Sequence, residues 1–277
     1  MMTFSKKICG ALLCSAVLVL AGCTAVADLA GYDTRTVNES AKKSYSQVVS
    51  QASSQQVLDT RSDTARRVHQ VFNRMTPHAN AANQTGVPFE WQMSVIRSDE
   101  LNAWAMPGGK MAVYTGLVEK LKLSDDEIAA IVGHEMTHAL QEHSKNAIGQ
   151  QILTQVAAGY TAQAVAAKTG WNTNSVGLMK DLLTDYGIGK PFSRYQEDLA
   201  DIGGVRLMAQ AGYNPEAAIT VWQKMNAANN NNNALVTLLS THPSNNARIE
   251  SIRQMLPEVM PIYEQNKIRT TTNKRKK

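Results

Sequence analysis

The stretch around which this chain is organised is Ile131-Val132-Gly133-His134-Glu135-Met136-Thr137-His138-Ala139-Leu140. It contains the pattern His-Glu-x-x-His, and about 3.6 residues per helical turn place His134 and His138 on one face, one turn apart. Both imidazoles can then reach a single metal ion, while Glu135 lies near enough to take a proton from a water at that ion. Because such a pentapeptide arises by chance in roughly one chain in a hundred, its surroundings must support the interpretation.

The surrounding residues predict a buried helix. Ser124 and Glu127 have the spacing of a capping box, which predicts a helix start next to Ser124. Buried histidines without partners would be costly, and a metal ion would give both nitrogens a partner. Apolar residues recur at helical spacing around the motif; they are Ile128, Ile131, Val132, Met136, Ala139 and Leu140.

A small β-sheet is predicted before this helix. Residues 91–96 alternate between apolar and polar, which indicates a strand with one buried face. Residues 101–106 and 111–114 flank Pro107-Gly108-Gly109-Lys110, the pattern of a hairpin with a glycine turn. An exposed edge of the hairpin can pair with an extended peptide substrate, and a hairpin that only packs beneath the helix is the alternative. The expected edge residues are Asn102, Ala103, Trp104 and Ala105.

Helices are predicted on both sides of this region. Residues 57–75 have apolar residues at three- and four-residue steps, which predicts an amphipathic helix that ends before Pro77. Residues 145–168 predict a helix that either packs on the domain or forms a lid, and no run in it is long enough to cross a bilayer. Residues 170–190 are loop-like at their start and end, and residues 229–233 form a polar run typical of a loop. The predicted fold class is α+β, mainly helical, with the small sheet beside the motif helix.

A second predicted helix carries two acidic side chains on one face. Ser193 and Gln196 have capping-box spacing, and Glu197 and Asp201 follow four residues apart on one face. Glu197 can supply the third protein ligand of a catalytic zinc, leaving the fourth position for water. Asp201 can accept a hydrogen bond from the outer nitrogen of a liganding histidine. By periodicity alone, however, two carboxylates on one helix face are most often solvated surface.

Five motifs in order, between about Asn102 and Arg248, resemble the M48 peptidases, a gluzincin family. This resemblance implies a zincin-type metallopeptidase domain, here assigned to residues 51–263. The motifs are Asn102-Ala103-Trp104-Ala105 with Pro107-Gly108-Gly109, Thr115-Gly116-Leu117, His134-Glu135-x-x-His138, Ser193-Arg194 with Glu197 and Asp201, and Thr241-His242-Pro243 with Arg248.

The resemblance also implies roles for individual residues around one Zn²⁺ per chain. His242 is implied to lie near the metal and to hydrogen-bond the oxyanion of the tetrahedral intermediate. Since His242 is also a competent nitrogen ligand, it can occupy the fourth metal position at rest, and the 145–168 helix is a second candidate for blocking the site. The implied metal ligands are His134, His138 and Glu197, the general base is Glu135, and Asp201 and Arg248 support the ligands.

The implied function is zinc-dependent endoproteolysis of unfolded or misassembled envelope proteins. The alternatives are a non-proteolytic, chaperone-like or client-binding lipoprotein of the outer membrane, and a metalloesterase. A site that had lost its catalytic role would be expected to have lost Glu135, so its presence together with Glu197 favours catalysis.

The N-terminal segment predicts export. Residues 1–22 contain Lys6 and Lys7 and then an apolar run, as in a secretory signal peptide. Leu20-Ala21-Gly22-Cys23 resembles the bacterial lipobox, which implies cleavage before Cys23 and lipidation of its thiol; an ordinary signal peptide is the alternative. Thr24 after the cysteine favours lipid anchoring at the periplasmic face of a bacterial outer membrane. Residues 23–50 are then predicted to be a lipidated N-terminus and tether.

Charge and composition limit the partners. The chain has 277 residues, of which 43% are hydrophobic and 18% charged, as in an ordinary globular protein. Much of its net charge of +5 comes from residues 264–277, a basic tail expected to be solvated and disordered, or else to contact anionic lipid or protein. Without a basic stripe on the folded part, nucleic acid is not expected. The expected partners are polypeptide substrates, the membrane, and outer-membrane assembly or quality-control proteins.

Overall fold

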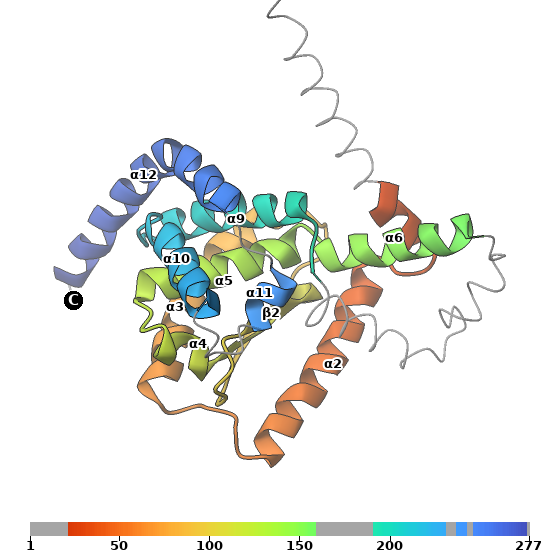
Figure 1. The fold of residues 1–277 in the computed structure, drawn as a ribbon, viewed down its shortest axis with the longest axis horizontal. Helices are drawn as coiled ribbons and strands as arrows, with labels where there is room; N and C mark the ends of the chain where they lie inside the picture. Colours follow the sequence, from red (N-terminus) through yellow and green to blue (C-terminus); the bar gives the residue numbers. More distant parts are fainter. Residues whose placement is uncertain (1–21, 159–190, 231–236, 243–245, 276–277) are drawn as a thin grey trace, which may run out of the picture.

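The computed structural model describes residues 22–158, 191–230, 237–242 and 246–275. Nearly all of the predicted signal peptide, the 170–190 loop and most of the asparagine run lie outside the described residues. Helices surround a small three-stranded sheet (Figure 1), which confirms the predicted mainly helical α+β fold class. None of the helices in the described part of the chain has the length and apolar character needed to cross a membrane.

Helix α5, Asp125–Leu140, runs through the middle of the molecule (Figure 1) and carries the His-Glu-x-x-His motif. Its start is the predicted capping box: the Ser124 hydroxyl accepts the Glu127 amide at 3.2 Å, and the Glu127 carboxylate accepts the Ser124 amide at 2.8 Å. Glu127 also pairs with Lys224 at 2.7 Å. Every residue from Glu127 to Ala139 is buried, which confirms the predicted core helix.

The sheet has the order β1-β3-β2, with β1 at Gln92–Ile96, β2 at Ala103–Met106 and β3 at Lys110–Tyr114. Strands β2 and β3 form the predicted antiparallel hairpin, while β1 pairs parallel to β3. The turn between β2 and β3 is a 3₁₀ segment, Pro107–Gly109, in which both glycines have positive φ angles that other residues rarely adopt. Because β3 lies between the other two strands, β2 lies at an edge of the sheet.

Helix α2, Thr34–Ser54, covers the sheet face that points away from α5. The Tyr45 hydroxyl hydrogen-bonds the Ser94 hydroxyl at 2.6 Å, and Tyr45 packs edge-on against Trp104. The prediction of a single buried face is therefore wrong, because α2 supplies a second layer. The expected tether also differs from the structure, since Val37, Ala41 and Tyr45 form a buried stripe at helical spacing in an otherwise polar segment.

Helix α3, Asp63–Ala82, corrects the prediction of a helix over residues 57–75. It starts later, because the Ser62 side chain caps it by accepting the Ala65 amide at 3.0 Å. It also continues through Pro77 instead of ending there. Met75 and Ala79, on either side of the proline, are fully buried, so packing compensates for the helix hydrogen bond that proline lacks.

The remaining helices complete the domain around α5. Helix α9 lies along α5 and α12 along α9 (Figure 1). Helix α12 is helical to Arg275, so the prediction of a disordered tail is wrong up to that residue. The part of the 145–168 helix that is described belongs to α6, and positions 159–168 lie outside the described residues. The bounds are Thr115–Lys120 for α4, His143–Ala157 for α6, Arg194–Gln210 for α9, Ala217–Asn230 for α10, Thr237–Thr241 for α11 and Asn246–Arg275 for α12.

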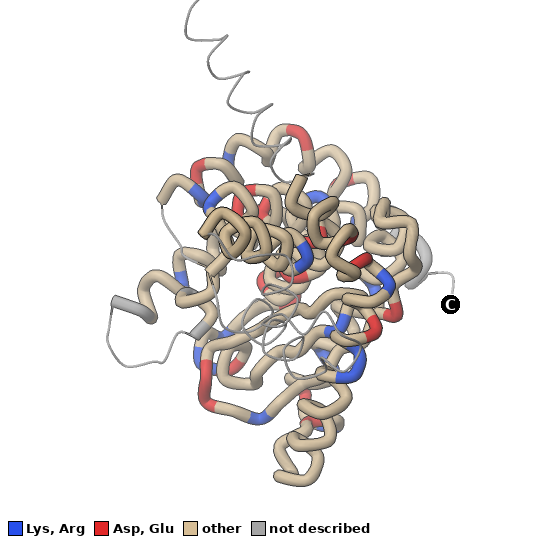
Figure 2. Tube along the Cα trace, turned by 90° about the vertical axis from the view of Figure 1, so that its right-hand side faces the viewer, with Lys and Arg blue, Asp and Glu red and all other residues tan. Residues whose placement is uncertain are grey.

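Acidic and basic residues are interspersed along the chain in the view of Figure 2. Many form pairs between neighbouring elements, such as Arg67 with Asp125 at 2.7 Å and Lys42 with Glu90 at 2.7 Å. Among the described residues, buried charged side chains gather between α5, α9 and α12, where Arg248 pairs with Glu197 and Asp201.

Candidate metal centre

Helices α5 and α9 approach each other closely at two glycines. A Cβ atom on Gly133 would lie 2.8 Å from the Gly204 carbonyl oxygen, and one on Gly204 would lie 2.8 Å from the His134 backbone nitrogen. A glycine inside a helix costs about 1 kcal/mol relative to alanine, and here it allows backbone contact between the helices. The sequence analysis did not predict this contact, although the adjacent glycines Gly203 and Gly204 in a predicted helix could have indicated it.

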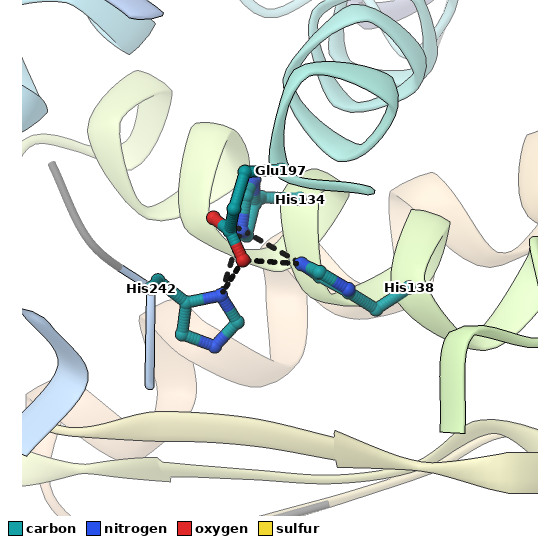
Figure 3. Close-up of side chains that lie close together, drawn as sticks. All are labelled: His134, His138, Glu197 and His242. Carbon is teal, nitrogen blue, oxygen red and sulfur yellow. Dashed lines mark hydrogen bonds and ion pairs between the residues drawn. The ribbon is translucent and has the colours of Figure 1, made fainter. Parts of the chain in front are cut away.

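This close approach brings the α5 histidines next to Glu197, and His242, which follows α11, joins them. The cluster of four buried side chains (Figure 3) is His134, His138, Glu197 and His242. Nε2 of His134 lies 3.1 Å from Nε2 of His138 and 3.2 Å from Nδ1 of His242. Oε1 of Glu197 lies 3.0 Å from that Nδ1 and 3.6 Å from Nε2 of His138. A tetrahedral ion with ligands at about 2.0–2.1 Å separates those ligands by about 3.3 Å. The four side chains therefore fit around one metal ion.

The protonation states of the cluster also suit a metal ion. Nδ1 of His134 donates to Oδ1 of Asp201 at 2.9 Å, so its other nitrogen, Nε2, faces the centre of the cluster. Burial opposes a charge on His134, but hydrogen bonds to Asp201 and Glu197 raise its pKa to about 9 when no metal competes with the proton. Burial lowers the pKa of His138 well below its ordinary value. A metal ion would have to displace the proton on Nε2 of His134, and neutral imidazoles around one carboxylate would then form a donor set for a transition-metal ion.

Glu197 remains ionised despite its burial. Burial alone would raise the pKa of its carboxyl, but the charges and hydrogen bonds of His242 and His134 outweigh it and lower the pKa. Nη1 of Arg248 also lies 2.7 Å from Oε2 of Glu197. The carboxylate thus presents one oxygen to the histidines and the other to the guanidinium.

Arg248 joins two carboxylates of α9, Glu197 and Asp201. Its Nε donates to Oδ2 of Asp201 and its Nη2 to Oδ1, both at 2.8 Å. Its guanidinium lies over the ring of Trp222, 3.9 Å from the centroid. Asp201 accepts from both His134 and Arg248, so the structure brings both predicted supporting residues into contact with metal-ligand candidates.

Glu135 lies on the other side of His242. Its Oε1 is 3.4 Å from Nε2 of His242, and the backbone amide of Ala105 donates to its carboxylate. Burial raises the pKa of Glu135, and the neighbouring charges of His242 and His134 oppose this rise. A carboxyl group with a raised pKa beside a metal position is suited to accepting and returning a proton.

The predicted substrate strand lies next to Glu135 but is covered. Asn102, Ala103, Trp104 and Ala105 are all buried. The backbone edge is also partly used, since the Leu238 amide donates to the Leu101 carbonyl at 3.1 Å and the Ala105 amide bonds to Glu135. The role of this strand in binding substrate stays a prediction.

Two residues at the site were not identified from the sequence. Nδ1 of His143 lies 2.8 Å from Nδ1 of His138, and the ring of Phe192 stacks on His138 with centroids 4.1 Å apart. A third histidine five residues after the motif was a signal for His143, whereas nothing in the sequence marked Phe192.

Cys23, the predicted lipidation residue, lies in a helix over residues 22–29. It is 3% exposed, and burial raises the pKa of its thiol. A Cβ atom placed on Gly149 of α6 would overlap the Cys23 carbonyl oxygen, so the N-terminal segment packs directly on α6. Lipidation of Cys23 stays a prediction.

Comparison with known proteins identifies the family of this chain. Residues 62–256 match Peptidase family M48. The mitochondrial metalloendopeptidase OMA1 of Schizosaccharomyces pombe is 35% identical over 169 residues, which are 61% of this chain and 48% of that protein. The metalloprotease LoiP of Escherichia coli, which the motifs and the lipobox together resemble, is 30% identical over 207 residues, or 73% of this chain and 77% of LoiP.

A third relative is the beta-barrel assembly-enhancing protease of Escherichia coli, which is 27% identical over 200 residues, or 70% of this chain and 39% of that protein. The chain thus spans about half the length, or less, of several relatives that it matches. The family expected from the motifs is confirmed, with the match covering most of the chain and all four residues of the metal cluster. This chain belongs to peptidase family M48.

Proposed function

We propose that this protein is a zinc-dependent endopeptidase, with zinc held by His134, His138 and Glu197. The observation that carries this proposal is the convergence of these buried ligand atoms with Glu135 alongside. Two imidazoles and a carboxylate are a common ligand set of catalytic zinc, which keeps one further position for water or substrate. Membership of family M48 supports the same activity.

The reaction follows from the placement of Glu135 and His242. When bound, zinc supplies Lewis-acid polarisation of a water molecule and of the scissile carbonyl group. Glu135 accepts the proton from the attacking water and delivers it to the leaving amine, and its burial-raised pKa suits both steps. His242 donates a hydrogen bond to the developing oxyanion.

We propose that at rest His242 would occupy the metal position that water needs. Its Nδ1 lies 3.2 Å from Nε2 of His134 and 3.0 Å from Oε1 of Glu197, as expected of a fourth metal ligand. Its backbone follows α11, whose last residue, Thr241, accepts the Phe192 amide at 3.2 Å. Movement of this segment would free the fourth position and turn the imidazole towards substrate.

We further propose that the enzyme acts on unfolded or misassembled envelope proteins. The signal peptide over residues 1–22 and a lipid on Cys23 would anchor it at the periplasmic face of a bacterial outer membrane. The lipobox and the relative named for β-barrel assembly support this assignment. Other outer-membrane assembly or quality-control proteins are the corresponding partners.

The test is cleavage of an unfolded protein by purified, zinc-loaded protein. Glu135→Gln should bind zinc like the parental protein and lose at least about 100-fold in cleavage rate, since the general base is missing. Glu250→Gln, an exposed glutamate in α12, is the matched control and should cleave at the parental rate. A chelator should abolish cleavage in the parental protein.

Two outcomes would contradict the proposal. Parental cleavage by Glu135→Gln would show that Glu135 is not the base. Client binding without chelator-sensitive cleavage by the loaded parental protein would favour the chaperone-like alternative.

A further inference from the structure

His143 contacts His138 on the side away from the metal cluster. Their Nδ1 atoms lie 2.8 Å apart, and the two rings meet edge to face with centroids 4.8 Å apart. If His138 binds a metal through Nε2, its Nδ1 carries the proton and donates a hydrogen bond to Nδ1 of His143. His143 is then the hydrogen-bond acceptor that orients the ligand, a role usually held by a carboxylate or a carbonyl oxygen.

A break between α5 and α6 creates this contact. Five residues along a continuous helix turn the side chain by about 140° and move it about 7.5 Å along the axis, away from its partner. Glu142 instead adopts a left-handed conformation, with φ 51° and ψ 36°, which interrupts the helix, and α6 begins at His143. Non-glycine residues adopt this conformation rarely and at some cost, often at functional sites.

The N-terminal segment holds Glu142 in place. The Thr34 hydroxyl donates to Oε1 of Glu142 at 2.7 Å, and the buried Lys145 donates to the same hydroxyl at 3.0 Å. Lys145 also pairs with Asp28 at 2.7 Å. The chain therefore uses a buried lysine and two acidic residues to maintain the turn that presents His143 to His138.

The other nitrogen of His143 shows that its burial does not serve stability alone. The side chain is 2% exposed, and Nε2 has no hydrogen-bond partner among the described residues. In the tautomer that accepts from His138, this Nε2 carries a hydrogen, and an unpaired buried N–H costs free energy. An apolar side chain of similar size would avoid that cost.

We propose that His143 is a positioning residue for the metal site: it fixes the tautomer and the ring orientation of His138 through the Nδ1–Nδ1 hydrogen bond. This inference rests on the zinc site proposed above. It assigns His143 no contact with substrate, so its primary effect is on metal affinity.

The experiment measures zinc affinity by competition with a chromophoric chelator, together with the thermal unfolding midpoint of the metal-free protein. His143→Leu should lower zinc affinity about 10- to 100-fold. It should leave the metal-free midpoint close to parental, because loss of the unpaired Nε2–H offsets loss of the partner of His138. His143→Asn should keep affinity within a few fold of parental, since its amide oxygen occupies nearly the place of Nδ1 and can accept the same hydrogen bond.

Ile152→Ala controls for looser packing of α6, where Ile152 is buried in the apolar cluster with α2. It should lower the unfolding midpoint and keep parental zinc affinity. Parental affinity in His143→Leu would overturn the inference, as would a joint loss of affinity and midpoint in both His143 variants. A parental protein that binds no zinc would overturn the proposed metal site itself.

Discussion

The two histidines of α5 have chemically different supports. His134 donates to the carboxylate of Asp201, and Arg248 pairs with both Asp201 and Glu197. We call Asp201, Glu197 and Arg248 the charged flank. His138 instead contacts the imidazole of His143 and the ring of Phe192, which we call the imidazole flank. A carboxylate acceptor makes a histidine a more basic ligand than a neutral imidazole does. Two identical ligands one turn apart are therefore expected to bind the metal unequally.

The flanks also differ in how the chain builds them. The charged flank comes from α9 and α12 and depends on mutual neutralisation, because a buried charge is costly without its partner. The imidazole flank is local in sequence, since His143 follows His138 after a single turn break. We therefore expect disruption of the charged flank to affect both folding and metal binding, and disruption at His143 to affect metal binding alone.

The largest effect is expected for Arg248→Met. This change leaves Asp201 and Glu197 buried without their cation, which should lower the free energy of unfolding by about 3–5 kcal/mol. Chemical denaturation would measure the loss. Arg253→Met, on the exposed part of the same helix, should change the stability by less than about 0.5 kcal/mol. Equal stabilities for the two variants would show that the charged flank does not depend on its arginine.

A smaller effect is expected for Gly204→Ala. The added Cβ would lie 2.8 Å from the His134 backbone nitrogen, so α9 must move away from α5. Overpacking of this kind costs about 1–3 kcal/mol, and it should weaken zinc binding by displacing Glu197 and Asp201. Arg206→Ala, on the exposed face of α9, is the control and should leave zinc affinity unchanged. Full zinc affinity in Gly204→Ala would argue against a need for the close helix contact.

The smallest of these effects, and the most direct comparison, is expected for Asp201→Asn. Asparagine can still accept from His134, but it has no charge to share with Arg248, so zinc affinity should fall about 10- to 100-fold. His143→Asn keeps a neutral hydrogen-bond acceptor on the imidazole flank, so its zinc affinity should fall less. Chelator competition on both variants would rank them, and equal losses would mean that the two flanks support their histidines equally.

Local signals were sufficient for much of the fold. The capping boxes at Ser124 and Ser193 and the glycine turn of the hairpin depend on residues within a few positions of one another, and all three occur as predicted. Pro77 was misjudged because the rule that proline ends a helix is also local, whereas tertiary packing of Met75 and Ala79 decides whether the helix continues. The α2 layer was missed for a related reason: its apolar stripe is narrow, and only the sheet that it covers shows that this stripe is buried.

For the site, the sequence by itself determined the donor types and their local spacing. His134 and His138 share a helix face with Glu135 beside it, and Glu197 and Asp201 share another, because residues four apart lie one turn apart in a helix. Only the tertiary structure decided which way these faces point: two glycines allow α9 to contact α5, and Arg248 gives the buried carboxylates a cation. It also decided that a left-handed residue at Glu142 turns His143 back to His138. These contacts join residues that no local pattern connects, and burial makes their charges and hydrogen bonds strong enough to matter.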